Sequence, residues 1–574
     1  MSNQEPPSDV RKRVREHWGN LEHPKKSKTE NNQGTPRNAG DANTEVIDLT
    51  SEKESDGADT SETDISQNEE QDVLGETTTT REEHKRSDDI SSVPTTNYPF
   101  KLMKSEIYDQ GTSSEHFVSL ESIFGAPKLA RSWLFSFQFE LDYILPMFAE
   151  NTRITIVAQR GTILPATLQT PRILKLVRNM ETSLVNMPPY ACHHSKLVVN
   201  QFDNGDCQIY IPSNNFTSAE TNIPTQIVWC SPLLKKFSSG SRPSVFRTAL
   251  SEYLQGYRAD FKPLIEALEQ VDFLPVDALG LQFVYSHPDI ASSGLPLLSR
   301  LLQDKHHTTE DKDKTHHYLA QVSTIGSPIK SGLRSPGNLF LHYMIPLFSG
   351  LIKPDTGTKR GTKPFDIPDY EKWLEINQIK PRIVYPTSEE VRTGPMGYMA
   401  GGWFHYHWRR NDASRELYQK LKKWGILYKR NPPVDYVRKG TPAHTKFLMK
   451  ATTVNAEGTI LDEMDWVLFT TGNLSMNAWG TYTSKPRNYE VGVLFKSTKQ
   501  VKIVIESAAN LAYSKFNGAG RSLTEVISND RKKISVMVPF ENVTVPYSNK
   551  DDSFCISTAY EEPDTLGNCH EPQA

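Results

Sequence analysis

The chain has 574 residues, which is enough for about two to four domains. Residues 1–95 hold 12 Lys and Arg against 22 Asp and Glu, whereas the rest of the chain holds 53 against 47, so an acidic segment precedes a mildly basic one. Because no window offers 18 consecutive apolar residues and the first residues lack an apolar signal core, the sequence predicts neither a membrane span nor a secreted protein.

Residues 1–95 are rich in Ser, Thr, Asn, Glu and Asp, and their one aromatic residue is Trp18. Such a segment cannot bury enough apolar surface to offset its ordering entropy, so we expect a disordered acidic tail. Its two basic clusters, at 11–15 and 25–28, are typical of a bipartite nuclear localisation signal, although a merely soluble basic stretch would look similar. The protein is therefore expected in the nucleus.

A short apolar run, Val46-Ile47-Asp48-Leu49, lies inside this tail and is followed by acidic and hydroxyl side chains. It could add as a strand to the exposed sheet edge of a partner, with the acidic flank directing it to a basic surface. The run resembles the SUMO-interacting motif, so SUMO or a sumoylated protein is an expected partner. A chance apolar cluster is the alternative.

Aromatic residues return from Tyr98 onward and mark the start of folded chain. Short apolar runs of strand type then alternate with amphipathic stretches, which predicts an α/β architecture. Strands are predicted at 154–159, 196–202, 207–213, 445–451, 466–472 and 491–496, a helix at 414–426, and surface insertions at 291–298, 326–337 and 354–364.

One pattern occurs twice in the folded part. An H-x-K tripeptide opens a predicted strand at 194–196 and again at 444–446. In each copy a turn and a second strand follow, and an asparagine comes at its end: Asn214 or Asn215 in the first copy, Asn473 in the second. A single H-x-K often arises by chance, but the doubled pattern with its asparagines is specific.

The spacing of this pattern has a chemical meaning. Side chains two apart on a strand share a face, so the His and Lys of each copy should point into the same space. Two facing copies would surround a phosphodiester, with one neutral imidazole attacking phosphorus and the other, protonated, donating to the leaving oxygen. Lys196, Lys446 and the asparagine amides would stabilise the negative charge. His405 and His407, set among aromatic residues, are expected to be ordinary packed or surface histidines.

At these residues the chain resembles the phospholipase D superfamily and, within it, the tyrosyl-DNA phosphodiesterase family. The superfamily's usual cassette carries an Asp shortly after the Lys, but 197–201 and 447–451 contain none, which argues against the lipid-cleaving branch. Similarity extends over most of residues 96–574, in YACHHSK at 190–196, Gln226 with WCSP at 229–232, Tyr385-Pro386, AGG at 400–402, NLSMNAWG at 473–480, YEVGV at 489–493 and PDTLGN at 563–568.

The resemblance implies an α/β fold of two similar phospholipase-D-like α-β-α sandwich domains, at 96–277 and 278–574, packed with pseudo-two-fold symmetry behind the tail at 1–95. It implies a DNA-repair phosphodiesterase that hydrolyses the 3′-phosphotyrosyl bond between DNA and a stalled topoisomerase I peptide, and other 3′ adducts, through a covalent phosphohistidine. The expected partner is a single-stranded or nicked DNA 3′ end carrying a tyrosyl peptide. We expect a monomer with no membrane association.

The resemblance makes His194 the nucleophile and His444 the general acid and base. Glu490 and Gln226 would each accept a hydrogen bond from the far nitrogen of one histidine, which fixes its tautomer. A surface carboxylate at Glu490 and a plain polar side chain at Gln226 are the alternatives. The sequence shows no carboxylate cluster and no Cys/His spacing typical of a metal site, so neither a metal nor another cofactor is expected.

Further residues are candidates for the substrate site. Tyr190 could stack on a base of a single strand, or pack in the core. Ser323 and Ser475 could bind DNA phosphates. The longer downstream match, through the WCSP run, favours Asn215 over Asn214 as the asparagine of the first copy.

Three rival functions fit parts of the pattern. A lipid phosphodiesterase would need a membrane anchor or a basic amphipathic helix, and the sequence offers neither. A nuclease that cuts plain strands would use similar chemistry. A catalytically inactive nucleic-acid-binding scaffold is disfavoured because all six positions of the two H-x-K…N copies hold competent residues.

Overall fold

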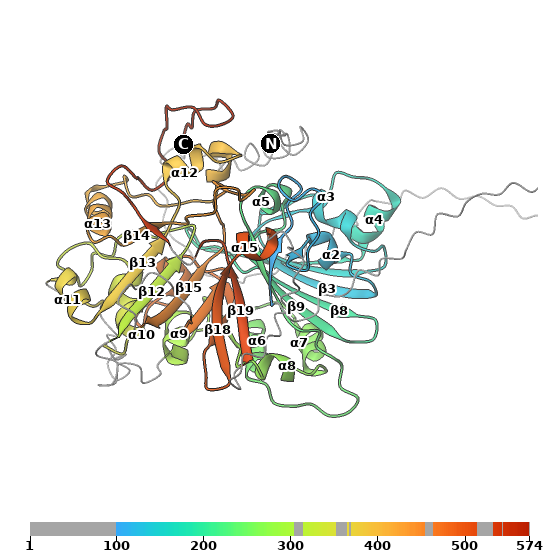
Figure 1. Ribbon diagram of the computed structural model, residues 1–574. Helices are drawn as coiled ribbons and strands as arrows, with labels where there is room; N and C mark the ends of the chain where they lie inside the picture. The colour runs from blue at the N-terminus through green and yellow to red at the C-terminus, as the bar shows by residue number, and fades with distance from the viewer. Residues whose placement is uncertain are drawn as a thin grey trace, which may run out of the picture. The chain divides into compact units, whose positions relative to one another are not determined.

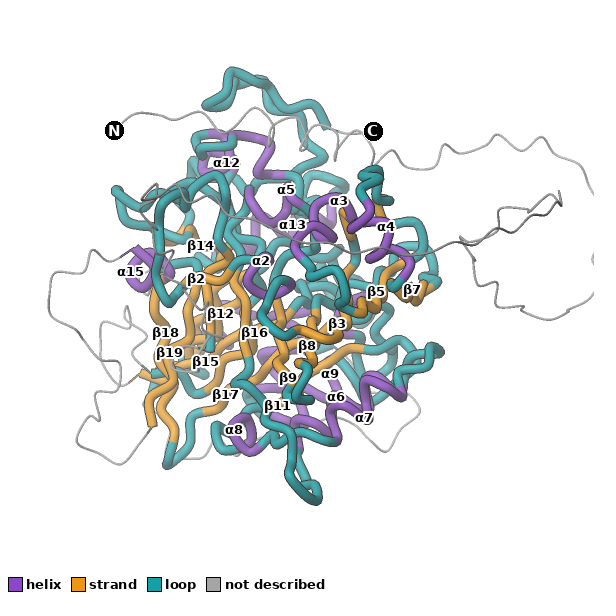
Figure 2. Tube along the Cα trace, turned by 90° about the vertical axis from the view of Figure 1, so that its right-hand side faces the viewer, coloured by secondary structure: helices purple, strands orange, loops and turns teal. Residues whose placement is uncertain are grey.

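The computed structural model describes residues 99–302, 314–351, 364–366, 369–453, 463–513, 532–541 and 544–572. Within these ranges the chain forms two eight-stranded mixed sheets with helices around them (Figures 1 and 2), which confirms the α/β prediction. The tail, with its expected nuclear and SUMO-interacting motifs, lies outside the described residues, as does the 354–364 insertion except for its last residue.

The first half of the folded chain supplies one sheet, a small second pair of strands, seven short or medium α-helices and one 3-10 helix among the described residues. They are β1 (Phe100–Met103), β2 (Phe117–Val118), α2 (Leu120–Phe124), β3 (Leu129–Ser136), β4 (Phe139–Glu140), α3 (Leu141–Ile144), the 3-10 helix η1 (Leu145–Met147), β5 (Arg153–Gln159), β6 (Ile163–Leu164), α4 (Pro171–Arg178), β7 (Met180–Val185), β8 (Leu197–Phe202), β9 (Cys207–Pro212), α5 (Ser218–Asn222), β10 (Ile227–Cys230), α6 (Val245–Gln255), α7 (Lys262–Glu269) and α8 (Leu274–Asp277).

The second half supplies the other sheet, the separate pair β18 and β19, and its own helices. They are β11 (Gln282–Ser286), α9 (Leu295–Leu302), β12 (Thr315–Gln321), the π-helix η3 (Phe340–Met344), α10 (Ile345–Phe348), α11 (Tyr370–Ile376), β13 (Ile379–Val384), α12 (Ser388–Arg392), the 3-10 helix η4 (Gly397–Gly401), α13 (Asp412–Lys423), β14 (Leu427–Lys429), β15 (Phe447–Thr453), β16 (Trp466–Thr470), α14 (Met476–Trp479), β17 (Glu490–Lys496), β18 (Val501–Ser507), α15 (Ala508–Tyr513), β19 (Lys532–Val538) and β20 (Val545–Pro546).

The two sheets share one topology. The order β1-β10-β9-β8-β3-β5-β7 in the first sheet matches β11-β17-β16-β15-β12-β13-β14 in the second, with the strands taken from the chain in the same sequence. The pairing directions match as well, because all neighbours are antiparallel up to β3 and β12, and the last two pairs of each sheet are parallel. The repeat of the two H-x-K segments therefore extends over seven strands, and the segments directly precede the equivalent strands β8 and β15.

Alternating apolar residues on β8 and β15 divide the interior into three cores. On β8, Leu197 and Val199 face a core shared by both halves, whereas Val198 faces a core made by the first half. On β15, Phe447 faces the shared core and Leu448 faces a core made almost entirely by the second half. Because side chains alternate between the faces of a strand, each of these strands connects its own half to the shared core.

Aromatic contacts across the shared core join the two sheets. Phe100 on β1 packs against Phe447, Phe469 and Phe495, which lie on three strands of the second sheet, with ring centroids 6.3, 5.5 and 5.3 Å away. Edge-on and tilted aromatic pairs of this kind stabilise a core by about 0.5–1.5 kcal/mol beyond their buried area. The contacts hold the two sheets, and with them the two H-x-K segments, in a fixed relation.

The six predicted strands are confirmed, with ends that shift by no more than two residues. The predicted helix at 414–426 is confirmed as α13, which ends earlier because Gly425 takes a left-handed φ of 62°. The surface insertion predicted at 291–298 is wrong from Leu295 onward: α9 begins there and buries its leucines, and the early Pro296 had disguised a helical apolar run.

The expected domain boundary between 277 and 278 falls in the segment that joins α8 to β11. All strands of the first sheet precede it and all strands of the second sheet follow it, but the division into domains stays a prediction. Among the described residues, no helix combines the length and apolarity needed to cross a membrane.

Candidate active site

Each H-x-K segment is bound through its backbone to the opposite half of the chain. The amide of His194 donates to the carbonyl of Tyr489 at 3.0 Å, directly before β17. The amide of His444 donates to the carbonyl of Thr225, also at 3.0 Å, two residues before the start of β10. Because β10 and β17 are equivalent strands, the two contacts are the same contact made twice, and they bring the two histidines to one site.

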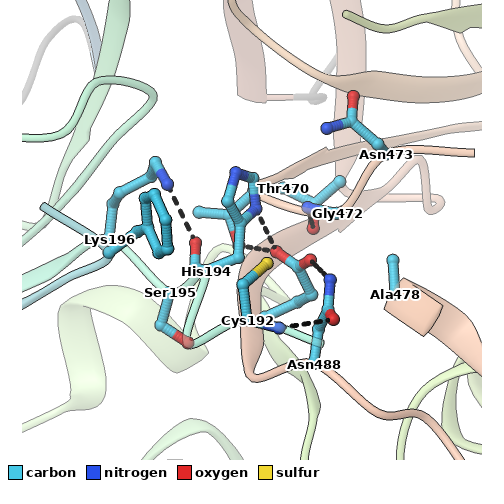
Figure 3. Close-up of polar contacts among 12 residues, drawn as sticks. Cys192, His194, Ser195, Lys196, Thr470, Gly472, Asn473, Ala478 and Asn488 are labelled. Atoms are coloured by element: carbon cyan, nitrogen blue, oxygen red, sulfur yellow. Dashed lines mark hydrogen bonds and ion pairs between the residues drawn. The ribbon is translucent and has the colours of Figure 1, made fainter. Parts of the chain in front are cut away.

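The His194 ring is held by a buried carboxylate. Its Nδ1 lies 2.8 Å from Oε2 of Glu490, which also accepts a hydrogen bond from the Thr471 hydroxyl at 2.7 Å. Oε1 of the same carboxylate accepts from Nδ2 of Asn488 at 3.0 Å, and Figure 3 labels His194 and Asn488 and draws this hydrogen bond as a dashed line. Glu490 is only 2 % exposed, so the alternative of a surface carboxylate is wrong. With Nδ1 engaged, Nε2 is the ring nitrogen left for chemistry.

The His444 ring is held differently from the expectation. Its Nδ1 lies 3.1 Å from Oε1 of Glu220, a residue that the sequence analysis did not select. Gln226 is buried beside the ring, but it approaches Nδ1 with its Nε2 donor at 3.4 Å, and that donor already serves the carbonyl of Glu220 at 3.0 Å. Nδ1–H therefore donates to the Glu220 carboxylate, and Gln226 supports this pair rather than accepting the proton.

Glu220 was hidden by a helix-capping pattern. Thr217 caps α5 by accepting from the amide of Glu220, so T-x-x-E looks like a capping box in which the glutamate returns to the cap. The carboxylate instead accepts from the backbone amide and from Nδ2 of Asn215, both at 2.8 Å. The sequence does show a glutamate five residues after Asn215, but this spacing by itself does not predict a carboxylate that binds a histidine.

The two halves differ in where they supply the carboxylate. Ala478 stands five residues after Asn473, in the place that Glu220 has in the first half. Glu490 is the first residue of β17 and corresponds to Gln226, which directly precedes β10. The first half thus supplies its carboxylate, Glu220, from helix α5, and the second half supplies its carboxylate, Glu490, from strand β17. Each histidine therefore has one carboxylate partner, and that partner comes from the other half.

The hydrogen bonds of the asparagines show whether Asn214 or Asn215 belongs to the first H-x-K copy. Oδ1 of Asn215 accepts from the Ser136 hydroxyl at 2.9 Å and from the backbone amide of Phe137, the residue after Ser136, at 3.2 Å. Oδ1 of Asn473 likewise accepts from the Ser323 hydroxyl at 3.2 Å and from the backbone amide of Thr324, the residue after Ser323, at 2.9 Å. This matched pattern makes Asn215 the counterpart of Asn473. The side-chain amide of Asn214 instead donates to the carbonyl of Asn215 and to the hydroxyl of Thr221. An amide whose oxygen is so engaged presents its NH2 group as the remaining donor.

Both lysines are buried within the same space. Nζ of Lys196 donates to the carbonyl of His194 at 3.1 Å, and Nζ of Lys446 donates to the carbonyl of His444 at 2.6 Å. Burial lowers the pKa of both ammonium groups, and the charge of Lys196 lowers the pKa of Lys446 further. An anion bound between two buried ammonium groups stabilises both positive charges.

Burial also controls the charge of the histidines. It lowers the pKa of His194, and the two lysines add to this against the opposing charge of Glu490. Burial and then the charge of Lys446 lower the pKa of His444 to about 3. Burial would raise the pKa of Glu220, but His444 and Lys196 lower it below its usual range. These shifts favour the neutral form of both imidazoles, and the negative charge of an entering phosphodiester favours protonation of one of them.

Tyr190 projects from the segment that leads to His194. It is 91 % exposed, so packing in the core is excluded, and its backbone takes a strained φ of 63°. Asn477 holds this conformation by donating to the carbonyl of Tyr190 at 2.6 Å. An exposed aromatic ring on a fixed backbone beside the site is a suitable platform for stacking.

The two candidate serines lie in supporting positions. Ser323 is buried, and its hydroxyl donates to Asn473, so it orients that amide instead of facing the substrate. Ser475 caps α14 by accepting from the amide of Ala478 at 3.1 Å. In the described ranges, no group of three or more His, Cys, Asp or Glu side chains could hold a metal ion.

Known proteins resemble this chain over most of its length. The family model described as tyrosyl-DNA phosphodiesterase matches residues 99–548. Tyrosyl-DNA phosphodiesterase 1 of Saccharomyces cerevisiae is 39 % identical over 481 residues, which cover 80 % of this chain and 84 % of the yeast protein. A probable tyrosyl-DNA phosphodiesterase of Caenorhabditis elegans is 24 % identical and covers 79 % and 88 % of the two chains. The crystal structure of the yeast tyrosyl-DNA phosphodiesterase superposes with a TM-score of 0.66 at 37 % identity, covering 79 % of this chain and 99 % of that one.

Proposed function

The chain belongs to the tyrosyl-DNA phosphodiesterase family, and from this membership we propose that it is a DNA-repair phosphodiesterase that cleaves tyrosyl adducts from DNA 3′ ends. The observation that carries the proposal is the pair formed by buried His444 and partly exposed His194, each bound through Nδ1 to a carboxylate of the other half and each beside a buried lysine. Such a site offers a nucleophile, a proton donor and two positive charges to one phosphorus atom.

The reaction has two in-line displacements. Nε2 of His194 attacks the 3′-phosphorus, a P–N bond forms, and the P–O bond to tyrosine breaks while protonated His444 donates to the departing phenolate. A water molecule then attacks phosphorus, gives a proton to the now neutral His444 and breaks the P–N bond, which leaves a 3′-phosphate. Lys196, Lys446 and the NH2 groups of the two cassette asparagines stabilise the crowded negative charge in both steps.

The substrate follows from the leaving group. A phenol has a pKa near 10, well below that of a sugar alcohol, so a tyrosyl adduct departs more easily than a nucleotide from the same site. Single-stranded or nicked 3′ ends carrying a tyrosyl peptide, such as that of a stalled topoisomerase I, are the proposed substrates. Other 3′ adducts with acidic leaving groups should react in the same way.

Turnover of a 3′-phosphotyrosyl oligonucleotide in excess EDTA tests this proposal. Release of tyrosine and of a 3′-phosphate is expected, with no hydrolysis of phosphatidylcholine vesicles by the same preparation. Hydrolysis of the lipid but not of the oligonucleotide would favour the lipid phosphodiesterase, and binding of DNA without turnover would favour the inactive scaffold.

Tyr190 is proposed to stack on a base of the bound strand. We expect Tyr190→Ala to raise KM for a 3′-phosphotyrosyl oligonucleotide by roughly 10-fold, because loss of one base–aromatic stack costs about 1–3 kcal/mol. Tyr190→Phe should keep the wild-type KM, since the ring and not the hydroxyl makes the contact. Steady-state kinetics of the three proteins decide, and an alanine variant with unchanged KM would rule the stack out.

The tail is proposed to send the protein to the nucleus and to bind SUMO through Val46, Ile47, Asp48 and Leu49. Both proposals rest on sequence patterns that lie outside the described residues. Deletion of residues 1–30 should redistribute a fluorescent fusion into the cytoplasm, and Val46→Ala with Ile47→Ala should abolish a SUMO-dependent shift in NMR spectra of the tail. The whole protein is proposed to be a monomer, which light scattering can check.

A further inference from the structure

The middle residue of each H-x-K tripeptide carries a buried hydroxyl that the reaction itself does not use. Ser195 and Thr445 are both fully buried. Because side chains alternate along an extended segment, these hydroxyls lie on the side opposite the histidine and the lysine. In Figure 3 the Ser195 hydroxyl points away from the imidazole of His194. A buried hydroxyl needs a hydrogen-bond partner, and the two tripeptides have different ones.

In the second half, one glutamine binds the segment on both sides of His444. The Thr445 hydroxyl donates to Oε1 of Gln321 at 2.5 Å, and Nε2 of Gln321 donates to the carbonyl of Ala443 at 3.2 Å. Gln321 is the last residue of β12, where it pairs with Phe447, and its side chain is buried. A single buried amide thus joins the residues directly before and after His444.

The first half reaches its hydroxyl from a helix instead. Phe135 takes the sheet position that Gln321 has in the second half, opposite the residue after the lysine, and its ring has no oxygen or nitrogen to offer. The Ser195 hydroxyl lies 2.6 Å from the hydroxyl of Tyr253 on α6. That hydroxyl is hydrogen-bonded to the hydroxyl of Tyr257, four residues further along the chain. A spacing of four residues keeps both side chains on one face of a helical segment.

The two tyrosines lead back to the segment at His193. Nε2 of His193 lies 2.8 Å from the Tyr257 hydroxyl, and Nδ1 lies 3.2 Å from the carbonyl of Ser136. A carbonyl can only accept, so Nδ1 carries a proton, and burial keeps the ring neutral by lowering the pKa of His193 to about 3. Nε2 therefore accepts from Tyr257. Since each hydroxyl has one proton, Tyr257 accepts from Tyr253, and Tyr253 accepts from Ser195.

We propose that these two sets of buried hydrogen bonds are clamps that position the reacting histidines. The first-half clamp is made by Tyr253 and Tyr257 and acts on His194. The second-half clamp is made by Gln321 and acts on His444. Each clamp joins the residue before the histidine to the residue after it, so it fixes the backbone from which the imidazole projects.

The precision that a displacement at phosphorus needs gives these clamps their importance. A shift of a reacting group by about 1 Å can slow a reaction by about 10²-fold. The carboxylate partners orient the imidazole rings, whereas the clamps hold the main chain beneath them. This inference rests on the proposed function and adds positioning residues that act through the histidines without touching the phosphate.

The two clamps should affect different displacements. His194 must reach phosphorus in the first displacement but is already bonded to it in the second, which needs His444 to accept a proton from water. We expect Ser195→Ala to slow formation of the phosphohistidine by about 10-fold, so less adduct accumulates than in the wild type. We expect Thr445→Val to slow its hydrolysis by about 10-fold, so more adduct accumulates. Single-turnover reactions of a labelled 3′-phosphotyrosyl oligonucleotide, quenched at intervals and separated on a denaturing gel, measure both rates.

Matched variants separate positioning from general stability. Ser132→Ala removes another fully buried hydroxyl, which joins β3 to β8 by donating to Asn200 at 2.7 Å, and both rates should stay at the wild-type level. Tyr253→Phe should repeat the result of Ser195→Ala, and the two combined should slow formation no further, because both interrupt the same chain. Thr445→Ser keeps the hydroxyl and should keep the wild-type rate of hydrolysis.

The outcomes separate the inference from the function on which it rests. Equal slowing of both displacements in the Ser195 and Thr445 variants would overturn the inference, because lost stability would then be the cause. Unchanged rates in both variants would overturn it as well, and so would an adduct that accumulates in Ser195→Ala but not in Thr445→Val. If the wild-type protein released no tyrosine from this substrate, the proposed function itself would fail.

Discussion

Replacing His444 with alanine is expected to convert the protein into a covalent adduct with its DNA substrate. The first displacement expels a phenolate, whose conjugate acid has a pKa near 10, so it needs less help from an acid than the attack of water needs from a base. We therefore expect hydrolysis of the phosphohistidine to slow by roughly 10²- to 10⁴-fold, and more than its formation slows. A labelled 3′-phosphotyrosyl oligonucleotide that migrates with the protein on a denaturing gel measures the trapped species.

His194→Ala is the partner of this prediction. Without the nucleophile neither displacement can begin, so we expect turnover to fall by at least about 10⁴-fold with no band at the mass of an adduct. The variant with both substitutions should behave like His194→Ala. A covalent species in the His194 variant, together with none in the His444 variant, would reverse the roles assigned to the two residues.

Much of this molecule was visible in its sequence because the chemistry repeats. H-x-K at 194–196 and 444–446 predicted two equivalent strands, and the structure extends that equivalence to seven strands of each sheet. Both tripeptides lie at strand starts because apolar residues of period two follow them, and this local pattern is what sequence reasoning detects best. The choice of Asn215 over Asn214 also agrees with the matched hydrogen bonds of the two asparagines.

The partners of these residues were harder to predict because they come from the opposite half of the chain. Glu490 was selected only through family resemblance, and Glu220 was not selected because its local pattern matches a helix cap. Ser323 looked like a phosphate ligand, yet its hydroxyl serves Asn473 inside the protein. His405 looked like an ordinary surface residue, and only the contact of its backbone with Ser323 places it beside the site. Long-range packing decides such roles, and no local periodicity encodes it.

Glu220→Gln is expected to give the second large effect. The substitution keeps the shape of the side chain but removes the anion that accepts from Nδ1 of His444 and holds Asn215. Histidines whose far nitrogen loses a carboxylate partner keep neither their tautomer nor their orientation. We expect kcat on a 3′-phosphotyrosyl oligonucleotide to fall by about 10²-fold, with a smaller change in KM, because the amount of productive His444 falls and the phosphate ligands remain.

The pH dependence separates this role from a merely structural one. The charge of Glu220 raises the pKa of His444, so its removal lowers that pKa. The acid step needs protonated His444 and is lost as pH rises through this pKa, so in Glu220→Gln the falling limb of kcat against pH should move to lower pH. If kcat falls while the profile stays in place, Glu220 acts only through Asn215.

A second substitution can restore the charge from another position. Gln226, directly before β10, corresponds to Glu490, the first residue of β17, and its side chain already lies 3.4 Å from Nδ1 of His444. Gln226→Glu, introduced into Glu220→Gln, would give His444 the strand carboxylate that His194 has. We expect this double variant to recover at least about 10-fold in kcat over Glu220→Gln and to return the falling limb toward its wild-type pH. Glu220→Gln combined with Gln226→Leu is the control that adds no charge, and recovery in that variant would show that charge at His444 is not what Glu220 supplies.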